Sequence, residues 1–280
     1  MAQTGVIQSV RRGRPSRSLS VTQVRVITVV AILAVWEAMA NSGLFYKDVI
    51  PSSVKIVVAM YHELLDGGFY YDLGYTFLEY VVGFSVGSII ALAAGIVLGA
   101  NPFLRRTYEP YLNAIGSTPK IIFLPILFLM FGTGIESKMA KGALSAFFPV
   151  VFATILGMIM IPQVLLRVGQ SFNLSRWQTV TKIYIPAMMN PIITGLRLGM
   201  AITVIGIVVA EIKFADAGVG HRLIGYYEQF RIAPMYAMLI FIFILAAAAN
   251  VGMSKVQDNF NRYKNVGSRK RSAAGSLSVN

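Results

Sequence analysis

The sequence predicts an all-α membrane protein with about six transmembrane helices and both termini in the cytoplasm. Hydrophobic residues make up 56% of its 280 residues and charged residues 13%, whereas soluble domains carry about 25% charged residues. The apolar residues gather in blocks close to the roughly 20 residues that one helical span requires. The basic residues gather between these blocks, and their uneven distribution predicts the orientation.

The apolar blocks predict one transmembrane domain between two basic tails. We expect this domain to cover residues 25–258, and the tails, residues 1–24 and 259–280, to be disordered because they cannot bury a core. The six predicted spans are residues 26–45, 74–98, 110–131, 141–161, 187–212 and 234–253. Ala38-Met39-Ala40 resembles a signal cleavage site. The first block is nearly of span length, however, and a retained first helix is favoured.

The distribution of basic residues predicts the topology. Sixteen of the 25 lysine and arginine residues lie in or next to the two tails, at Arg105-Arg106 and in the polar interval 162–186. This excess predicts that these segments are cytoplasmic, as in a multi-pass protein of the cytoplasmic membrane. It also explains the net charge of +13 without nucleic acid as a partner, since the basic runs lack interleaved aromatic residues. The chain has no cysteine and only two histidines, so it predicts no metal site and no cofactor.

The connector of residues 44–73 predicts an amphipathic helix that starts at Pro51-Ser52-Ser53 and ends before Gly67-Gly68. Its apolar side chains recur at helical spacing. They are Val54, Val57, Val58, Tyr61 and Leu65. We expect this face to lie either on membrane lipid or on the protein itself.

The second and third predicted spans contain residues that shape helix packing. Gly83, Gly87 and Gly95 are expected to let a neighbouring helix approach closely. The third span contains three prolines, and Pro119 lies near its middle. A proline removes a backbone hydrogen bond and bends a helix. Such breaks persist at membrane depth only where protein or a water-filled cavity covers them.

Three charged residues in predicted spans are candidates for a translocation path: Lys120, Arg197 and Glu211. A charged side chain in a span is costly and marks a functional site by default. Lys120 has the alternative of extending to the membrane boundary. Arg197 could instead have a structural role, in which it pairs with Glu211 or with a backbone carbonyl.

The polar interval 162–186 predicts two short helices joined by a sharp corner. Pro162 suits the start of a helix, and Asn173 tolerates the left-handed backbone that ends one. Ser175 is expected to cap the second helix, and Pro186 to close it. Trp177 and the basic residues near it are typical of a docking surface.

The same interval resembles the cytoplasmic EAA loop of ABC importer permeases. That pattern has a Glu-Ala-Ala start, a glycine six residues after the glutamate, nine further residues and then Ile-x-Leu-Pro. Here Ile183-Tyr184-Ile185-Pro186 forms the end at the same spacing, and Asn173 stands at the glycine position. Arg167 replaces the glutamate, and Val168-Gly169 replaces the two alanines. The change from glutamate to Arg167 reverses a charge on the docking surface. The contact that the family's glutamate makes can therefore not be assigned to Arg167.

Further segments resemble the nitrate, sulfonate and taurine branch of these permeases. They include Thr194-Gly195-Leu196-Arg197 and Val208-Val209-Ala210-Glu211. The resemblance implies the membrane bundle of a type I ABC importer permease. The function that it implies is that of a permease subunit in an ATP-driven importer. Such an importer would move a small oxyanion, such as nitrate, a sulfonate or taurine, across the inner membrane.

The resemblance also implies the partners. They are two ABC ATPase subunits, a second permease copy, a periplasmic or lipoprotein substrate-binding protein and membrane lipid. ATP hydrolysis is expected in the ATPase, so the chain itself is expected not to be an enzyme; its lack of a G-x-x-x-x-G-K-[ST] phosphate loop agrees. The residues expected to dock the ATPase are Arg167, Gly169, Asn173, Ser175, Arg176, Trp177 and Pro186.

A stand-alone secondary transporter or channel is the alternative function. It would need residues for a coupling ion and often shows inverted repeats. No repeat relates the two halves of this chain.

Overall fold

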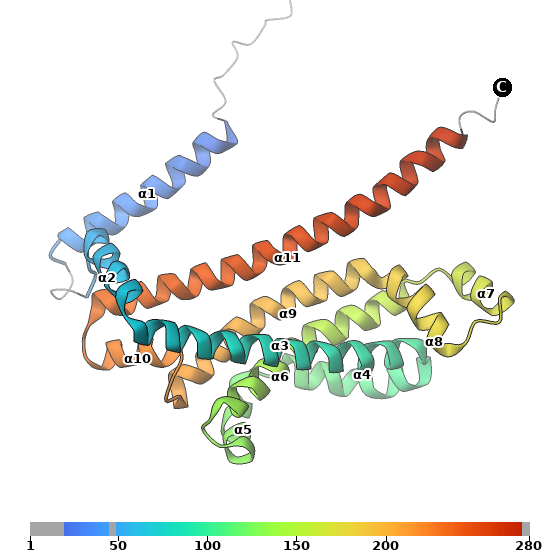
Figure 1. The fold of residues 1–280 in the computed structure, drawn as a ribbon, viewed down its shortest axis with the longest axis horizontal. Helices are drawn as coiled ribbons and strands as arrows, with labels where there is room; N and C mark the ends of the chain where they lie inside the picture. Colours follow the sequence, from blue (N-terminus) through green and yellow to red (C-terminus); the bar gives the residue numbers. More distant parts are fainter. Residues whose placement is uncertain (1–19, 45–48, 276–280) are drawn as a thin grey trace, which may run out of the picture. The chain divides into compact units, whose positions relative to one another are not determined.

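The computed structural model describes residues 20–44 and 49–275, with side chains as far as Lys255 and at Gln257. This part of the chain contains helices and no strand (Figure 1). The α-helices are α1 (Val21–Asn41), α2 (Ser53–Leu65), α3 (Gly67–Ala100), α4 (Pro102–Ser117), α5 (Leu124–Phe131), α6 (Ile135–Ile159), α7 (Gln163–Ser171), α8 (Arg176–Thr179), α9 (Ile185–Phe214), α10 (Val219–Glu228) and α11 (Ile232–Gly275). A 3₁₀ helix, η1 (Lys120–Phe123), precedes α5, and a π-helical turn, η2 (Val180–Tyr184), precedes α9. The chain divides into two compact units, up to Lys55 and from Ile56.

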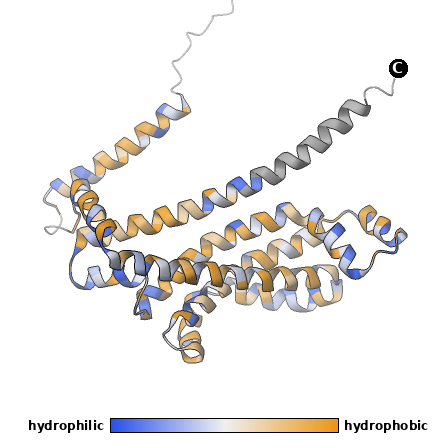
Figure 2. Cartoon of the chain, viewed as in Figure 1, coloured by the Kyte–Doolittle hydropathy of each residue, from blue (hydrophilic) through white to orange (hydrophobic). Residues whose placement is uncertain are grey.

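Five helical segments in the described chain are long and apolar enough to cross a membrane. They are α1, α3, α6, the continuous stretch Arg176–Phe214, and α11 over Ile232–Lys255. The bent pair Pro102–Ser117 and Lys120–Phe131 is a sixth candidate. Hydrophobic residues run along these segments (Figure 2). The predicted all-α membrane fold is therefore confirmed, while the orientation of the termini stays a prediction.

Both ends of the transmembrane domain differ from the predicted boundaries. Residues 1–19 of the predicted N-terminal tail lie outside the described residues. Helix α1 begins at Val21, before the apolar block, because Ser20 and Gln23 form a reciprocal capping box. At the other end, α11 continues to Gly275, through most of the segment from residue 259 for which composition predicts disorder. The arginines and lysines of this segment have good helix propensity.

The third predicted span, residues 110–131, is wrong as a single helix. Helix α4 ends at Ser117, and the segment of η1 and α5 leaves it at an angle of 92°. Pro119 has no N–H to continue the helix, and its ring forces Thr118 into extended backbone, with φ −67° and ψ 137°. The break frees carbonyl groups at the end of α4. One of them, on Gly116, accepts a hydrogen bond from Lys120 Nζ at 2.7 Å.

Helices α3, α6 and α9 pack together as the core of the second unit (Figure 1). A Cβ on Gly83 would lie 2.7 Å from the carbonyl oxygen of Met139, and one on Gly87 would overlap the backbone of Ala143. Gly95 meets α6 in the same way. The prediction that these three glycines admit a neighbouring helix is therefore confirmed, and that neighbour is α6.

Helix α2 turns a different face to the protein from the one predicted. Its buried residues are Ile56, Ala59 and Glu63. The predicted apolar face is exposed along its length. The helix therefore packs on the protein, but through a different face from the predicted one. Arg222 and Tyr226 donate hydrogen bonds to Glu63 and hold the helix in this register.

Arg222 of α10 ties α2 to the start of α3. Its guanidinium bonds Glu63 Oε2 at 2.8 Å and Asp72 Oδ2 at 3.2 Å, and it also pairs with Asp66. Burial opposes the charge of Arg222, but hydrogen bonds to Asp66 and Glu63 raise the pKa of its guanidinium. In return, hydrogen bonds from Arg222 and from the Gly68 N–H hold the pKa of the Asp66 carboxyl below its ordinary value. The stabilisation by Asp66 is therefore present above the ordinary carboxyl pKa and is lost as the pH falls through the lowered one.

Replacing Arg222 with methionine is expected to destabilise the protein by about 2–4 kcal/mol, because it leaves the buried Glu63 carboxylate without its charge partner. Thermal unfolding of the full-length chain in detergent measures this loss. Arg231→Met is the control, because Arg231 is exposed and its guanidinium lies over the Tyr226 ring, a contact that contributes less than about 1 kcal/mol. Equal losses in the two variants would show that the ion pairs do not stabilise the fold.

Candidate functional site

The polar interval forms a helix–corner–helix, as its residues predict. Helix α7 ends just before Asn173, which adopts a left-handed backbone with φ 47°, a conformation that asparagine tolerates. The Leu174 N–H then donates to the carbonyl of Gly169 at 3.1 Å, so the chain turns back along α7. Ser175 caps α8 through reciprocal hydrogen bonds with Gln178. We refer to residues 163–184 as the corner.

Pro186 does not close the second helix, contrary to the prediction. Helix α8, the π turn η2 and α9 form one continuous helical stretch, Arg176–Phe214. Pro186 lies in the first turn of α9, directly after the wider π turn, where the missing N–H and the proline ring are accommodated. The corner is therefore joined without interruption to a transmembrane helix.

The corner is anchored to the membrane domain by a small apolar cluster. Its buried members are Met158, Ile161, Met188 and Ile192, with Leu166 and Tyr184 packed against them. Gly169 is buried as well, and a Cβ at this position would lie 2.5 Å from Ile183 Cδ1. The small size of Gly169 therefore lets α7 lie close to η2.

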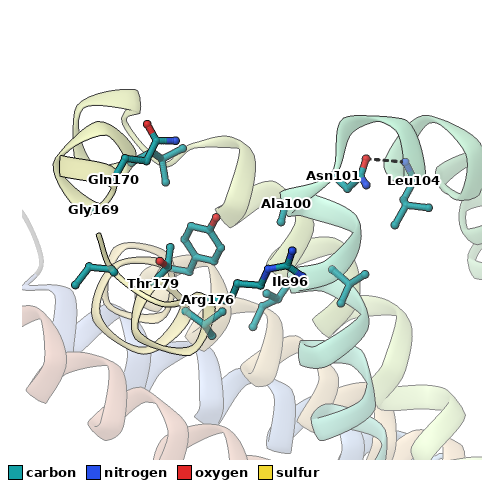
Figure 3. A pocket seen from close by; sticks show the side chains of 13 residues that line it. Ile96, Ala100, Asn101, Leu104, Gly169, Gln170, Arg176 and Thr179 are labelled. Carbon is teal, nitrogen blue, oxygen red and sulfur yellow. Dashed lines mark hydrogen bonds between the residues drawn. The ribbon is translucent and has the colours of Figure 1, made fainter. Parts of the chain in front are cut away.

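A cavity of about 580 Å³ lies between the corner and the junction of α3 and α4. Figure 3 shows Gly169, Gln170, Arg176 and Thr179 on the corner side and Ile96, Ala100, Asn101 and Leu104 on the other. Asn101 Oδ1 accepts a hydrogen bond from the Leu104 N–H at 3.3 Å and caps α4. Because side chains do not fill this space, the corner is joined more firmly to α9 than to α3.

The surface of the corner carries exposed aromatic and basic side chains. Trp177 is 75% exposed and Phe172 74%, and Arg167 and Arg176 are also exposed. Large aromatic residues and arginines are enriched at protein interfaces. The residues predicted to dock an ATPase all lie in the corner or directly after it, and Gly169 is the buried member of that set.

The structure places Lys120 at the break between α4 and α5. The residue is half-buried, and its Nζ lies 5.1 Å from the centre of the Phe148 ring in α6. Lys120 therefore contacts the helices of the core. Its ammonium also satisfies a carbonyl that the break leaves free.

Arg197 does not pair with Glu211, so that alternative is wrong. The two residues are about 21 Å apart along α9, at 1.5 Å per residue. Arg197 Nε instead donates to Asn250 Oδ1 at 2.8 Å and its Nη1 to Gln257 Oε1 at 3.5 Å, both on α11.

Glu211 belongs to a buried polar cluster that sequence reasoning missed. It is completely buried, and its oxygens accept hydrogen bonds from Thr76 Oγ1 at 2.5 Å and from the Gly220 N–H at 2.7 Å. Glu79 of α3 is 1% exposed and interacts directly with Glu211. The positive charge of Lys138 in α6 attracts both carboxyl groups. The spacing of Thr76 and Glu79 placed them on one helix face, but nothing in the sequence indicated the partner helix.

Lys141 of α6 is a second buried charge that sequence reasoning missed. It is 3% exposed, and its Nζ donates no hydrogen bond within the described part of the chain. The positive charge of Lys120 repels that of Lys141. The predicted span began at Lys141, whereas α6 begins at Ile135, so the lysine lies nearly two turns inside the helix.

Residues 70–263 match the model of the family described as binding-protein-dependent transport system inner membrane component. The match covers more than half of the chain. The chain belongs to this family. As a permease it is a multi-pass transport component of the cytoplasmic membrane, which confirms the resemblance carried by the corner.

Three relatives place the permease in the sulfonate, nitrate and taurine branch. It is 27% identical over 231 residues to the aliphatic sulfonates transport permease SsuC of Bacillus subtilis, covering 82% of this chain and 81% of the relative. It is 25% identical to the nitrate import permease NrtB of Synechocystis sp., covering 78% of this chain and 82% of the relative. It is 24% identical to the taurine transport permease TauC of Escherichia coli, covering 82% and 86%.

The fold of the permease matches a solved structure of the MetNI methionine ABC transporter in an inward-facing conformation. The TM-score is 0.59 at 19% identity, and the match covers 68% of this chain and 95% of that chain. The predicted type I importer permease fold is therefore confirmed.

Proposed function

We propose that this permease forms the membrane pathway of an ATP-driven importer for a small oxyanion, with nitrate, a sulfonate or taurine as candidates. It acts with two ATPase subunits, a second copy of itself and a periplasmic or lipoprotein substrate-binding protein. The observation that carries this function is the exposed corner, joined without interruption to α9. Membership of the family supports it and does not favour a stand-alone secondary transporter or channel.

The corner is suited to transmit movement from an ATPase to the membrane helices. In the predicted orientation it faces the cytoplasm, with Trp177 and Phe172 exposed to a partner. A shift of α8 passes to α9 through η2, because the three form one helical stretch. Helix α9 packs on α6 and α3, so its movement repositions the core. The cavity beside the corner leaves space for this shift.

A pair of lysines supports an anion as the transported solute. The charge of Lys120 acts on the buried Lys141, and within the described residues neither lysine forms an ion pair with a carboxylate. Like charges in a buried site destabilise each other, and an oxyanion between them would offset that repulsion. Lys120 lies directly after the helix break at Pro119, and irregular backbone of this kind lines solute paths in transporters. The hydrogen bonds of Arg197 and Glu211 favour structural roles for those two residues.

Replacing Lys141 with methionine is expected to reduce solute import about tenfold, the equivalent of one charge-assisted hydrogen bond. The same change is expected to leave the thermal stability unchanged or higher, because a buried charge without a partner is replaced by an apolar side chain. Uptake by proteoliposomes and thermal unfolding in detergent measure the two effects. Lys213→Met, at an exposed lysine of α9, is the control. Normal import by the Lys141 variant would exclude this lysine from the path.

Uptake by proteoliposomes that contain the permease, its ATPase and its binding protein tests the proposed function. Import is expected only with ATP on the ATPase side and with the binding protein present. Import that an ion gradient drives in the absence of ATP would support the stand-alone transporter instead.

A further inference from the structure

A pocket of about 360 Å³ lies at the end of the membrane domain opposite the corner. The start of α3, the N-terminal end of α6 and the connector between α9 and α10 form it. Its lining includes Tyr71, Tyr75, Glu79, Lys138 and Asp216. The 25 residues of α6 separate the two ends by about 37 Å, at 1.5 Å per residue. In the predicted orientation this pocket faces the periplasm.

Glu79 lines this pocket, and one of its two carboxyl oxygens is an unsatisfied acceptor. It lines the pocket wall while being 1% exposed, and its Oε2 has no hydrogen-bond partner among the described residues. The adjacent Glu211 is satisfied, because Thr76 and Gly220 donate to its two oxygens. Buried carboxyl oxygens without a partner are rare in native proteins. The pocket is therefore the place from which a donor would reach Glu79.

Acidic residues outnumber basic ones in the lining of the pocket. Glu79 and Glu211 interact directly, and Lys138 offsets the charge of one of them. Two buried carboxylates in contact require a second positive charge or a shared proton. Glu136 and Asp216 are exposed in the same pocket and add negative charge.

We infer that this pocket binds a primary ammonium group, with Glu79 Oε2 as a hydrogen-bond acceptor. The rings of Tyr71 and Tyr75, with centroids 4.9 Å apart, line the pocket and offer aromatic faces that attract a cation. A calcium or magnesium ion would require about six oxygen ligands. Within the described residues no group of three or more acidic or histidine side chains is arranged to hold a metal ion.

On the basis of the proposed function, we assign the ammonium group to the transported solute. The solute would then be an oxyanion that also carries an amine. The acidic pocket would receive the amine end of an amino-sulfonate at the periplasmic entrance. Lys120 and Lys141 would contact its anionic end further along the path. The pocket would thereby select amino-sulfonates over simple sulfonates.

Binding of ethylammonium to the full-length permease in detergent tests the site directly. Ethylammonium chloride is expected to raise the thermal unfolding temperature, whereas tetramethylammonium, which has the same charge and no N–H, is expected to raise it much less. This comparison uses the wild-type protein and does not depend on a variant that folds. Equal protection by the two cations, or none by either, would overturn the inference.

Two variants then distinguish a specific hydrogen bond to Glu79 from a general attraction of the acidic pocket for cations. Glu79→Gln is expected to weaken ethylammonium binding about tenfold or more, the effect of one charge-assisted hydrogen bond. Glu136→Gln removes an exposed charge from the same pocket and is expected to change binding less than about threefold. Equal losses in the two variants would mean that the pocket attracts cations without a defined site.

A transport comparison assigns the source of the ammonium group. The assembled importer is given taurine and ethanesulfonate, which differ only in the amine. Glu79→Gln is expected to lower the ratio of taurine to ethanesulfonate import. An unchanged ratio would overturn the assignment to the solute. Import of neither compound by the wild-type complex would exclude an amino-sulfonate as the solute and would overturn the assignment, while the binding result with ethylammonium would stand independently.

Discussion

Replacing Trp177 with aspartate is expected to abolish stable association of the permease with its ATPase. Trp177 is the exposed aromatic residue at the start of α8, and burial of such a side chain at the centre of an interface contributes about 2 kcal/mol or more. The aspartate would also carry a charge into that interface. We therefore expect an ATPase affinity lower by about 30-fold or more. Co-purification of the ATPase and transport-coupled ATP hydrolysis in proteoliposomes measure the effect.

The control for this experiment is Phe230→Asp. Phe230 is 85% exposed and lies in the α10–α11 turn, on the predicted periplasmic side. Its backbone is left-handed, with φ 52°, a conformation that aspartate tolerates. This variant is expected to retain the ATPase. Unchanged assembly and unchanged coupled ATP hydrolysis in the Trp177 variant would exclude the corner as the docking element.

Replacing Gly87 with alanine is expected to destabilise the membrane domain by about 3 kcal/mol or more, a large value for one methyl group. The added Cβ would overlap the Cα and carbonyl carbon of Ala143, and both are backbone atoms of α6 that no side-chain rotation can move away. The two helices would have to separate along their shared face. Thermal unfolding and the yield of monodisperse protein in detergent measure the loss.

Gly74→Ala on the same helix is the matched control. Gly74 is exposed, and a Cβ at this position meets no atom within 4 Å. Alanine is better than glycine in a helix by about 0.8–1.0 kcal/mol, so this variant is expected to be as stable as the wild type or slightly more stable. Equal loss of stability in both variants would show that the close contact of α3 and α6 is not what holds the core.

The local chemistry of the corner could be predicted from sequence, because each step depends on residues within a few positions. Asn173 takes the left-handed conformation through its own side-chain chemistry, and Ser175 caps α8 with a partner three residues away. The error at Pro186 has a local cause as well. A proline that is expected to end one helix also fits the first turn of the next, and the π turn before it joins the two.

The partners of the charged residues in the spans could not be predicted in the same way. Arg197 was considered as a partner of Glu211, but its bonds are with α11. Glu79 meets Glu211 only because α3 and α9 lie against each other in the bundle. Hydrophobic periodicity shows that a helix is buried without showing which neighbour covers each face.

The sequence by itself determined the membrane class, the approximate spans, the helix–corner–helix and the resemblance to importer permeases. These features follow from composition, from charge distribution and from hydrogen bonds between near neighbours. The tertiary structure decided that the third span is broken, that Lys141 is buried inside α6 and that Glu79, which lines a pocket, has an unsatisfied oxygen. The reason is physical: the environment of a buried charge is set by the helices packed around it, and those come from distant parts of the chain.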